Sequence, residues 1–159
     1  MKYFFIVLTV MLSGLTAKSQ LVPHMPETAE DSVMAVISKM FTAMKNADPE
    51  LLKSCFADSM VLQTISKNKE GMLIVRNDNL AGFIDFIRKE SPGNADERIT
   101  FDVVKVDGPL AIAWTPYNFY YKGQFSHCGV NSFQLVRFND EWKIQYLIDT
   151  RRKQGCKSD

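Results

Sequence analysis

The sequence contains few of the residues that common metal and nucleotide sites require. Its 159 residues include two histidines, three cysteines and eight glycines. His127 and Cys128 are adjacent, but neighbouring residues of a strand point to opposite faces, so these two cannot share a metal ion. The sequence also has no glycine-rich phosphate loop and no Ser-His-Asp set. We therefore expect neither a metal site nor a cofactor.

Neither sign of charge is in excess. The chain has 19 basic and 18 acidic residues, spread along its length, and a formal net charge of +1. Such a chain has no electrostatic field that would hold a polyanion, so we do not expect nucleic acid as a partner. A length of 159 residues corresponds to one domain.

The one long apolar run lies at the N-terminus. Lys2 precedes an apolar stretch at residues 3–15, and Ala17-Lys18-Ser19 has the small-x-small form of a cleavage site. A membrane-spanning helix needs roughly 20 apolar residues, more than this run supplies. The pattern therefore predicts a signal peptide over residues 1–19. No cysteine follows the cleavage site, which excludes a lipoprotein anchor.

Cleavage would leave an exported protein, periplasmic or secreted, without a membrane anchor. Residues 20–27 contain two prolines and no periodicity, so they are expected to form a flexible leader. A single domain is expected over residues 28–153 and a short tail over residues 154–159.

Hydrophobic periodicity predicts three helices in the first half of the chain. Apolar residues recur at steps of three and four within residues 31–48. Asp48 is a good N-cap for a second, short helix. Either Asp78 or Asn79 caps a third helix over residues 80–90.

The second half of the chain changes to a period of two. A hairpin is expected within residues 60–76, and four further strands at 98–108, 110–123, 124–140 and 141–152. This order indicates the α+β class, with a strongly curved antiparallel sheet of about six strands wrapped around the three helices. Such a cone leaves a central cavity that suits a small ligand.

Alternation along the last three strands predicts which side chains share the cavity face. The register is set by two-residue turns at Lys122-Gly123 and Asn139-Asp140. It predicts that the cavity face carries Trp114, Asn118, His127, Asn131, Phe133 and Tyr146. It predicts that the outer face carries Tyr117, Phe119, Tyr121 and Asp149. A bulge at Pro116, which cannot donate to the sheet, would shift this assignment.

The same register indicates a disulfide. Cys128 lies beside the end of the last strand, and Cys156 lies just beyond that end. A turn through Gly155 would bring the two sulfur atoms together, so a Cys128–Cys156 bridge is reachable in an oxidising compartment. Cys55 falls in the second predicted helix, where we expect a buried thiol.

Three passages and the order of elements resemble a known superfamily. The passages are "CFADSMVLQTI", "WTPYNFYYKGQFSHCG" and "EWKIQYLIDTRR". They resemble the cone-fold (cystatin-like) superfamily of nuclear transport factor 2, and more closely its small bacterial branch of lumazine-binding-like and SnoaL-like proteins. The resemblance covers residues 28–153. It implies a conical cavity and commonly a homodimer packed through the outer sheet face, but no single activity.

Three functions remain open on this basis. The leading hypothesis is an exported domain that binds a small, partly apolar or aromatic molecule, which Trp114 would stack on and His127, Asn131 and Asn118 would orient. The second is a lyase, isomerase or cyclase that uses His127 as general acid or base. The third is a dimeric interaction module without catalysis. The predicted cavity face has no carboxylate on the last three strands, so no complete catalytic set is visible.

Overall fold

Three helices and one sheet make up residues 28–156, the part of the chain that the structure describes. In this computed structural model the elements follow in the order α1 (Ala29–Lys45), α2 (Pro49–Ser54), β1 (Phe56–Lys67), β2 (Leu73–Asp78), α3 (Leu80–Arg88), β3 (Ala95–Ile99), β4 (Val103–Asp107), β5 (Leu110–Tyr121), β6 (Gln124–Phe138) and β7 (Glu141–Thr150). The predicted signal peptide and leader, residues 1–27, and residues 157–159 lie outside the described residues.

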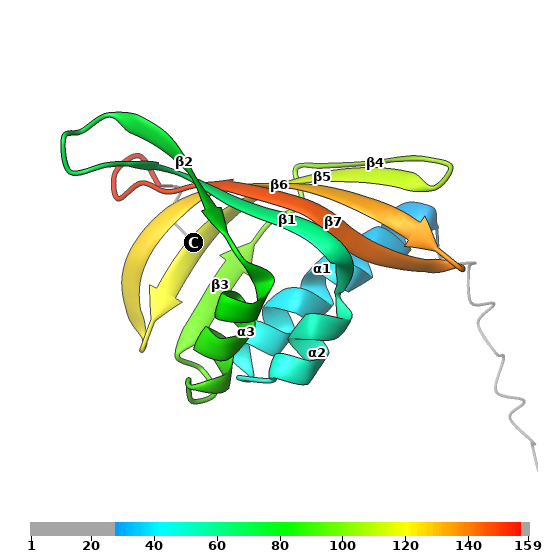
Figure 1. Ribbon diagram of the computed structural model, residues 1–159, viewed down its shortest axis with the longest axis horizontal. Coiled ribbons are helices and arrows are strands. Elements are labelled where there is room, and N and C mark those ends of the chain that lie inside the picture. The colour runs from blue at the N-terminus through cyan, green and yellow to red at the C-terminus, as the bar shows by residue number, and fades with distance from the viewer. Residues whose placement is uncertain (1–27, 157–159) are drawn as a thin grey trace, which may run out of the picture.

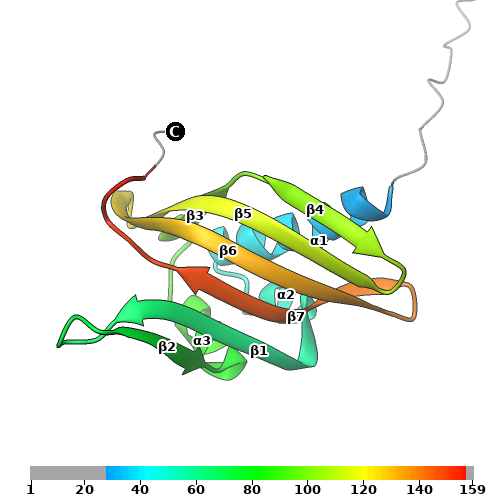
Figure 2. The ribbon, with the colours of Figure 1, turned by 90° about the horizontal axis from the view of Figure 1, so that it is seen from above.

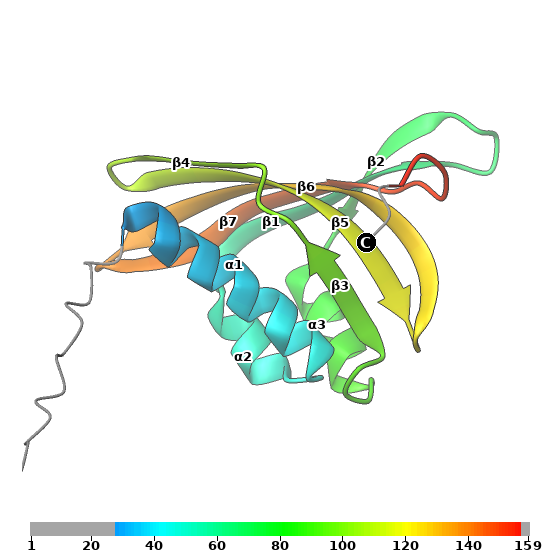
Figure 3. The same ribbon diagram turned by 180° about the vertical axis from the view of Figure 1, so that it is seen from behind.

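The helices lie together on the concave side of the curved sheet (Figure 1). From above, the sheet covers the helices, with β2 at one edge (Figure 2). From behind, α1 runs beneath the sheet, and β3 descends beside the helices (Figure 3). This one-sided layering confirms the predicted α+β class.

Each helix begins at a side-chain cap. The Thr28 hydroxyl accepts a hydrogen bond from the Asp31 backbone N–H at 3.0 Å, and the Asp48 carboxylate accepts one from Leu51 at 2.9 Å. The Asn79 side chain caps α3, so Asp78 is not needed for capping. Asp78 is instead the last residue of β2, where it lines the cavity described below.

The sheet has seven strands in the order β2-β1-β7-β6-β5-β3, with β4 also paired to β5. β1 and β7 are parallel and the other pairs are antiparallel. The single strand predicted at residues 98–108 is therefore two strands. Pro116 lies in β5 between the segment paired with β3 and the segment paired with β4. It pairs with Val130 without a register shift, so the bulge considered at Pro116 does not occur.

A bulge in β7 changes the predicted face of its second half. Leu135 pairs with Ile144, but Gln134 pairs with Tyr146, so Gln145 has no partner in β6. One extra residue moves every later side chain to the other face of the sheet. Asp149 therefore faces the helices, against the prediction, while Tyr146 faces away.

A second bulge lies at the start of β6. Phe119 pairs with His127, but Tyr120 pairs with Phe125, so Ser126 has no partner in β5. The prediction carried the turn register past this point without the extra residue. As a result it assigned the wrong face to β5, whereas the β6 residues from His127 onward kept their predicted side.

β6 and the end of β7 approach one another closely at Gly129. A Cβ on Gly129 would lie 1.7 Å from the Thr150 carbonyl oxygen, so this position requires glycine. Just beyond this close approach, Cys128 pairs with Arg152, one residue further than predicted because of the β7 bulge. Cys128 and Cys156 form the disulfide that the sequence indicated, with Cα atoms 5.8 Å apart, and Cys55 is a buried free thiol.

Candidate functional site

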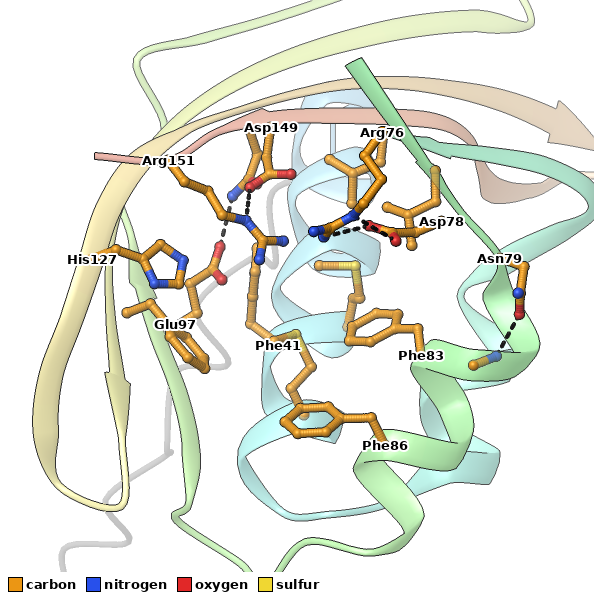
Figure 4. A pocket seen from close by; sticks show the side chains of 17 residues that line it. Phe41, Arg76, Asp78, Asn79, Phe83, Phe86, Glu97, His127, Asp149 and Arg151 are labelled. Carbon is orange, nitrogen blue, oxygen red and sulfur yellow. Dashed lines mark hydrogen bonds and ion pairs between the residues drawn. The ribbon is translucent and has the colours of Figure 1, made fainter. Parts of the chain in front are cut away.

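A cavity of about 400 Å³ lies between the helices and the concave face of the sheet. One part of its wall is apolar, formed by Met40, Phe41, Met44, Leu62, Phe83, Phe86, Phe119 and Leu147. The polar side chains gather toward the sheet, above the phenylalanine rings (Figure 4). We call the group of Arg76, Asp78, Glu97, Asp149 and Arg151 the polar end of the cavity.

Asp149 is the best-bonded group of the polar end. Its carboxylate accepts hydrogen bonds from the Thr64 hydroxyl at 2.6 Å, from Arg151 Nε at 2.8 Å and from the Tyr117 hydroxyl at 3.2 Å. Arg151 Nη2 also donates to the Thr64 hydroxyl at 3.2 Å. Thr64 is 1% exposed and Asp149 is 7% exposed, so these bonds compensate a buried carboxylate. The network ties β1, β5 and β7 together.

A second arginine–carboxylate pair faces the first. Arg76 donates to both oxygens of Asp78, from Nε and from Nη2, each at 3.0 Å. This two-bond geometry fixes the plane of the guanidinium. Arg76 and Arg151 extend toward one another from β2 and from the end of β7 (Figure 4). Their side chains are 50% and 43% exposed, so both lie at the opening of the cavity.

Glu97 on β3 reaches the cavity from the other side. Its Oε1 accepts a hydrogen bond from the Asn131 amide at 2.8 Å. Burial raises the pKa of Glu97 to about 7; the Asn131 hydrogen bond opposes that shift, and the negative charge of Asp149 adds to it. The cavity therefore holds a carboxyl group that exchanges its proton near neutral pH.

His127 lies beside Glu97 in the cavity wall (Figure 4). Its ring packs against Tyr117 and Phe119, with ring centroids 5.7 and 5.1 Å away. The Ser126 hydroxyl lies 3.0 Å from His127 Nδ1. Burial lowers the pKa of His127 and the positive charge of Arg151 acts in the same direction, whereas Asp149 opposes the shift, so the environment favours the neutral imidazole.

The structure places only part of the predicted ligand-binding set in the cavity. His127 and Asn131 line it. Phe133 lies on the same face but is fully buried in the core, where it packs edge-on against Phe41. The predicted binding role of these residues stays a prediction.

Three residues of that set face away from the cavity, and their predicted placement was wrong. Trp114 is 46% exposed on the outer face of the sheet. Asn118 lies on the outer face as well, close to the disulfide, and the Tyr146 hydroxyl donates to Gln63 at 2.6 Å. The Ser126 bulge accounts for Trp114 and Asn118, and the Gln145 bulge accounts for Tyr146.

The aromatic residues of β5 were assigned to the wrong side for the same reason. Phe119 lines the cavity, and Tyr117 is buried with its hydroxyl on Asp149. The Tyr121 hydroxyl donates to Glu90 at 2.8 Å, and its ring lies against Phe86 of α3. The predicted outer surface of exposed rings at these positions therefore does not exist.

Sequence reasoning missed the charged residues of the cavity. Asp149 and Arg151 were hidden by the Gln145 bulge. Arg76 and Asp78 form an arginine and an aspartate two residues apart near the end of β2, a spacing that puts both on one face of a strand. That spacing was the available signal. Glu97 gave none, because the prediction began the strand only at Arg98.

Residues 28–156 contain no group of three or more histidine, cysteine, aspartate or glutamate side chains that could hold a metal ion. Their helices are all too short or too polar to cross a lipid bilayer.

The proton on Glu97 gives a pH-dependent stability that can be measured. The folded protein holds the proton up to about pH 7, whereas the ordinary pKa is 4.5, so Glu97 lowers stability as pH rises through that window. Glu97→Gln lacks this titration. The difference in free energy of unfolding between the variant and the parent protein should therefore shift in favour of the variant by on the order of 2 kcal/mol from pH 5 to pH 8. Urea denaturation at both pH values measures the difference. Exposed Glu70→Gln is the control, and an equal effect of Glu97→Gln at both pH values would contradict the assignment.

The comparisons with known proteins agree on the fold. We found no family model and no curated protein that matches the sequence. Solved structures do match. An NTF2-like protein of unknown function from Shewanella baltica has a TM-score of 0.62 at 14% identity, covering 77% of this chain and 93% of its own.

Two further solved structures are similar over most of both chains. A domain of unknown function with a cystatin-like fold from Nostoc punctiforme has a TM-score of 0.59 at 18% identity, covering 80% of each chain. A proposed dehydratase of the NTF2-like family from Streptomyces avermitilis has a TM-score of 0.58 at 18% identity, covering 80% of this chain and 99% of its own. This chain therefore has the NTF2-like cone fold that its sequence resembles.

Proposed function

We propose that the protein binds a small, partly apolar organic molecule in its cone cavity. One observation carries the proposal: the cavity has an apolar wall, and its charged groups lie together at one end. A volume of about 400 Å³ is within the range of small-molecule sites. An apolar wall favours the body of a ligand, and a separate polar end fixes its orientation.

The apolar wall suits an aromatic or similarly flat body. Phe41, Phe83 and Phe86 approach the cavity from α1 and α3 (Figure 4). Aromatic rings bury a large area and contact other rings in defined geometries. Trp114, which was expected to stack on the ligand, cannot do so from the outer face.

Export is part of this proposal. The Cys128–Cys156 disulfide supports it, because such bridges persist mainly in oxidising compartments. The apolar N-terminal run with its small-x-small cleavage site supports it independently. An exported binding protein would meet its ligand outside the cytoplasm.

Ligand binding can be tested by blocking the cavity from one strand. Leu62 lines the cavity, whereas the preceding residue, Val61, is 45% exposed on the opposite face. Leu62→Trp should abolish the fluorescence increase of the neutral probe N-phenyl-1-naphthylamine, because the indole fills the space that the probe needs. Val61→Trp should leave the titration unchanged. Equal binding by both variants would place the probe outside the cavity and contradict the proposal.

A second candidate function is acid–base catalysis in the same cavity. The observation that favours it is the position of Glu97, a carboxyl with a pKa of about 7, beside His127 in a partly apolar wall. A group that titrates near the working pH is suited to proton transfer. The likeness to a proposed dehydratase supports the lyase form of this candidate. Asp149 of β7 lines the same cavity, so the expectation that the cavity face of the last three strands lacks a carboxylate was wrong.

Proton abstraction can be tested with 5-nitrobenzisoxazole, an apolar compound that a carboxylate base opens by removing its C3 proton. The anionic form of Glu97 should accelerate this opening, with a rate that rises through about pH 7. Glu97→Gln should lower the rate by about 100-fold. Asp102→Asn, which changes a carboxylate on the outer face, is the control. A rate unaffected by Glu97→Gln would remove the catalytic candidate and leave binding untouched.

We also propose a homodimer packed through the outer face of the sheet. Alternate residues of β5 are exposed and apolar on that face: Leu110 at 47%, Ile112 at 42% and Trp114 at 46%. Val103 of the neighbouring β4 is 39% exposed and pairs directly with Trp114. A contiguous apolar row of this kind is typical of an interface.

Light scattering at several protein concentrations tests the dimer. The parent protein should show twice the mass of one chain, and Ile112→Glu should show the mass of one chain because a charge would lie in the interface. Leu73→Glu is the control, since Leu73 is 72% exposed but lies in β2 at the far edge of the sheet. A parent protein that is monomeric at high concentration would contradict the proposal.

A further inference from the structure

The two arginines at the polar end limit the chemistry of the ligand. We infer that the cavity ligand is an organic monocarboxylate, with its acid group between Arg76 and Arg151 and its apolar body against the phenylalanine wall. This inference rests on the proposed binding function of the cavity. It adds the chemical class of the ligand and the residues that select it.

Both guanidinium groups keep one side free for a ligand. Arg76 uses Nε and Nη2 to bind Asp78, and Arg151 uses Nε to bind Asp149 and Nη2 to bind Thr64. Within residues 28–156, neither Nη1 atom hydrogen-bonds to another side chain or to the backbone. Arg76 belongs to β2 and Arg151 directly follows β7, and the two side chains extend toward one another in the cavity (Figure 4). A carboxylate placed between them would accept one charge-assisted bond at each oxygen.

The charge balance at the opening disfavours a multiply charged ligand. Two arginines are balanced by Asp78 and Asp149, so an anion would gain hydrogen-bond donors there and no surplus of positive charge. A monocarboxylate would add hydrogen-bond acceptors where free donors exist. A dianion such as a phosphate monoester would add a second charge close to both aspartates, with no further cation to match it. At the N-terminus of α3, the Asn79 side chain accepts a hydrogen bond from the Gly82 N–H and so satisfies one donor of the first turn.

Glu97 makes the binding of an anion depend on pH. The groups that face it are Tyr117 on β5, His127 and Asn131 on β6, and Asp149 and Arg151 at β7. A ligand carboxylate in this surrounding would repel ionised Glu97, so the two are compatible when Glu97 holds its proton. Binding would then take up a proton above about pH 7, and affinity would fall as pH rises. A neutral ligand would show no such fall.

A matched pair of ligands tests the inference. 1-Naphthaleneacetate and 1-naphthaleneacetamide share the same apolar body, and only the first carries a carboxylate. Calorimetry at pH 6.5 should show that the acetate binds at least about tenfold more tightly, as expected for hydrogen bonds to a charged group. This preference should disappear in Arg76→Gln and weaken in Arg151→Lys, which keeps the charge but loses the planar fork. Arg137→Gln, which changes a surface arginine paired with Asp140, should keep the preference.

Other outcomes overturn the inference in distinguishable ways. Equal affinity for the acetate and the acetamide, with both lost in Leu62→Trp, would leave the binding cavity intact and remove the carboxylate preference. Tighter binding of 1-naphthyl phosphate than of the acetate would show that the site selects a dianion, which contradicts the inferred preference for a monocarboxylate. If neither naphthalene compound binds while N-phenyl-1-naphthylamine does, the inference fails and cavity binding stands. If none of these compounds binds, the inference and the proposed function fail together.

Discussion

Gln145, the unpaired residue of β7, determines the chemistry of the cavity. Without it, the regular alternation would point Tyr146 and Ile148 toward the helices, and the cavity would be more nearly apolar. With it, Leu147, Asp149 and Arg151 line the cavity instead. Such a shift of one residue reverses every later side chain of a strand, so a single bulge converts a hydrophobic wall into a charged opening. The charged residues contributed by β2 and β3 then share the cavity with a second arginine–carboxylate pair, Arg151 and Asp149.

The buried hydrogen bonds around Asp149 hold this arrangement in place. Thr64, Tyr117 and Arg151 all donate to that carboxylate, and they belong to three different parts of the sheet. A buried carboxylate without such donors would be strongly destabilising, so the bonds and the placement depend on each other. Gly129 allows β6 to lie close to the Thr150 backbone at the end of β7. The Cys128–Cys156 disulfide fixes the chain just beyond that point. The polar end is thus part of the structural framework as well as a candidate recognition site.

The sequence was sufficient for the fold and insufficient for the site. Helix caps such as Asp48 and turns such as Asn139-Asp140 are local signals, and the structure has these features where they were expected. The inward direction of His127 and Asn131 was also predicted, because β6 kept its alternation between the two bulges. Bulges have no comparable local signal: nothing in the residues around Ser126 or Gln145 marks them as unpaired. The assignment of Trp114, Asn118, Tyr146 and Asp149 therefore failed together, and with it the conclusion that the cavity lacks a carboxylate.

The pairing of β6 with β7 is the feature that tests this account most directly. Cross-strand nuclear Overhauser effects report which residues lie opposite one another. We predict contacts of Phe133 with Leu147 and of Gln134 with Tyr146, which place Asp149 and Arg151 in the cavity. Contacts of Phe133 with Tyr146 and of Asn131 with Ile148 would instead show an unbroken register. That result would turn both charged residues away from the cavity and contradict the proposed polar end.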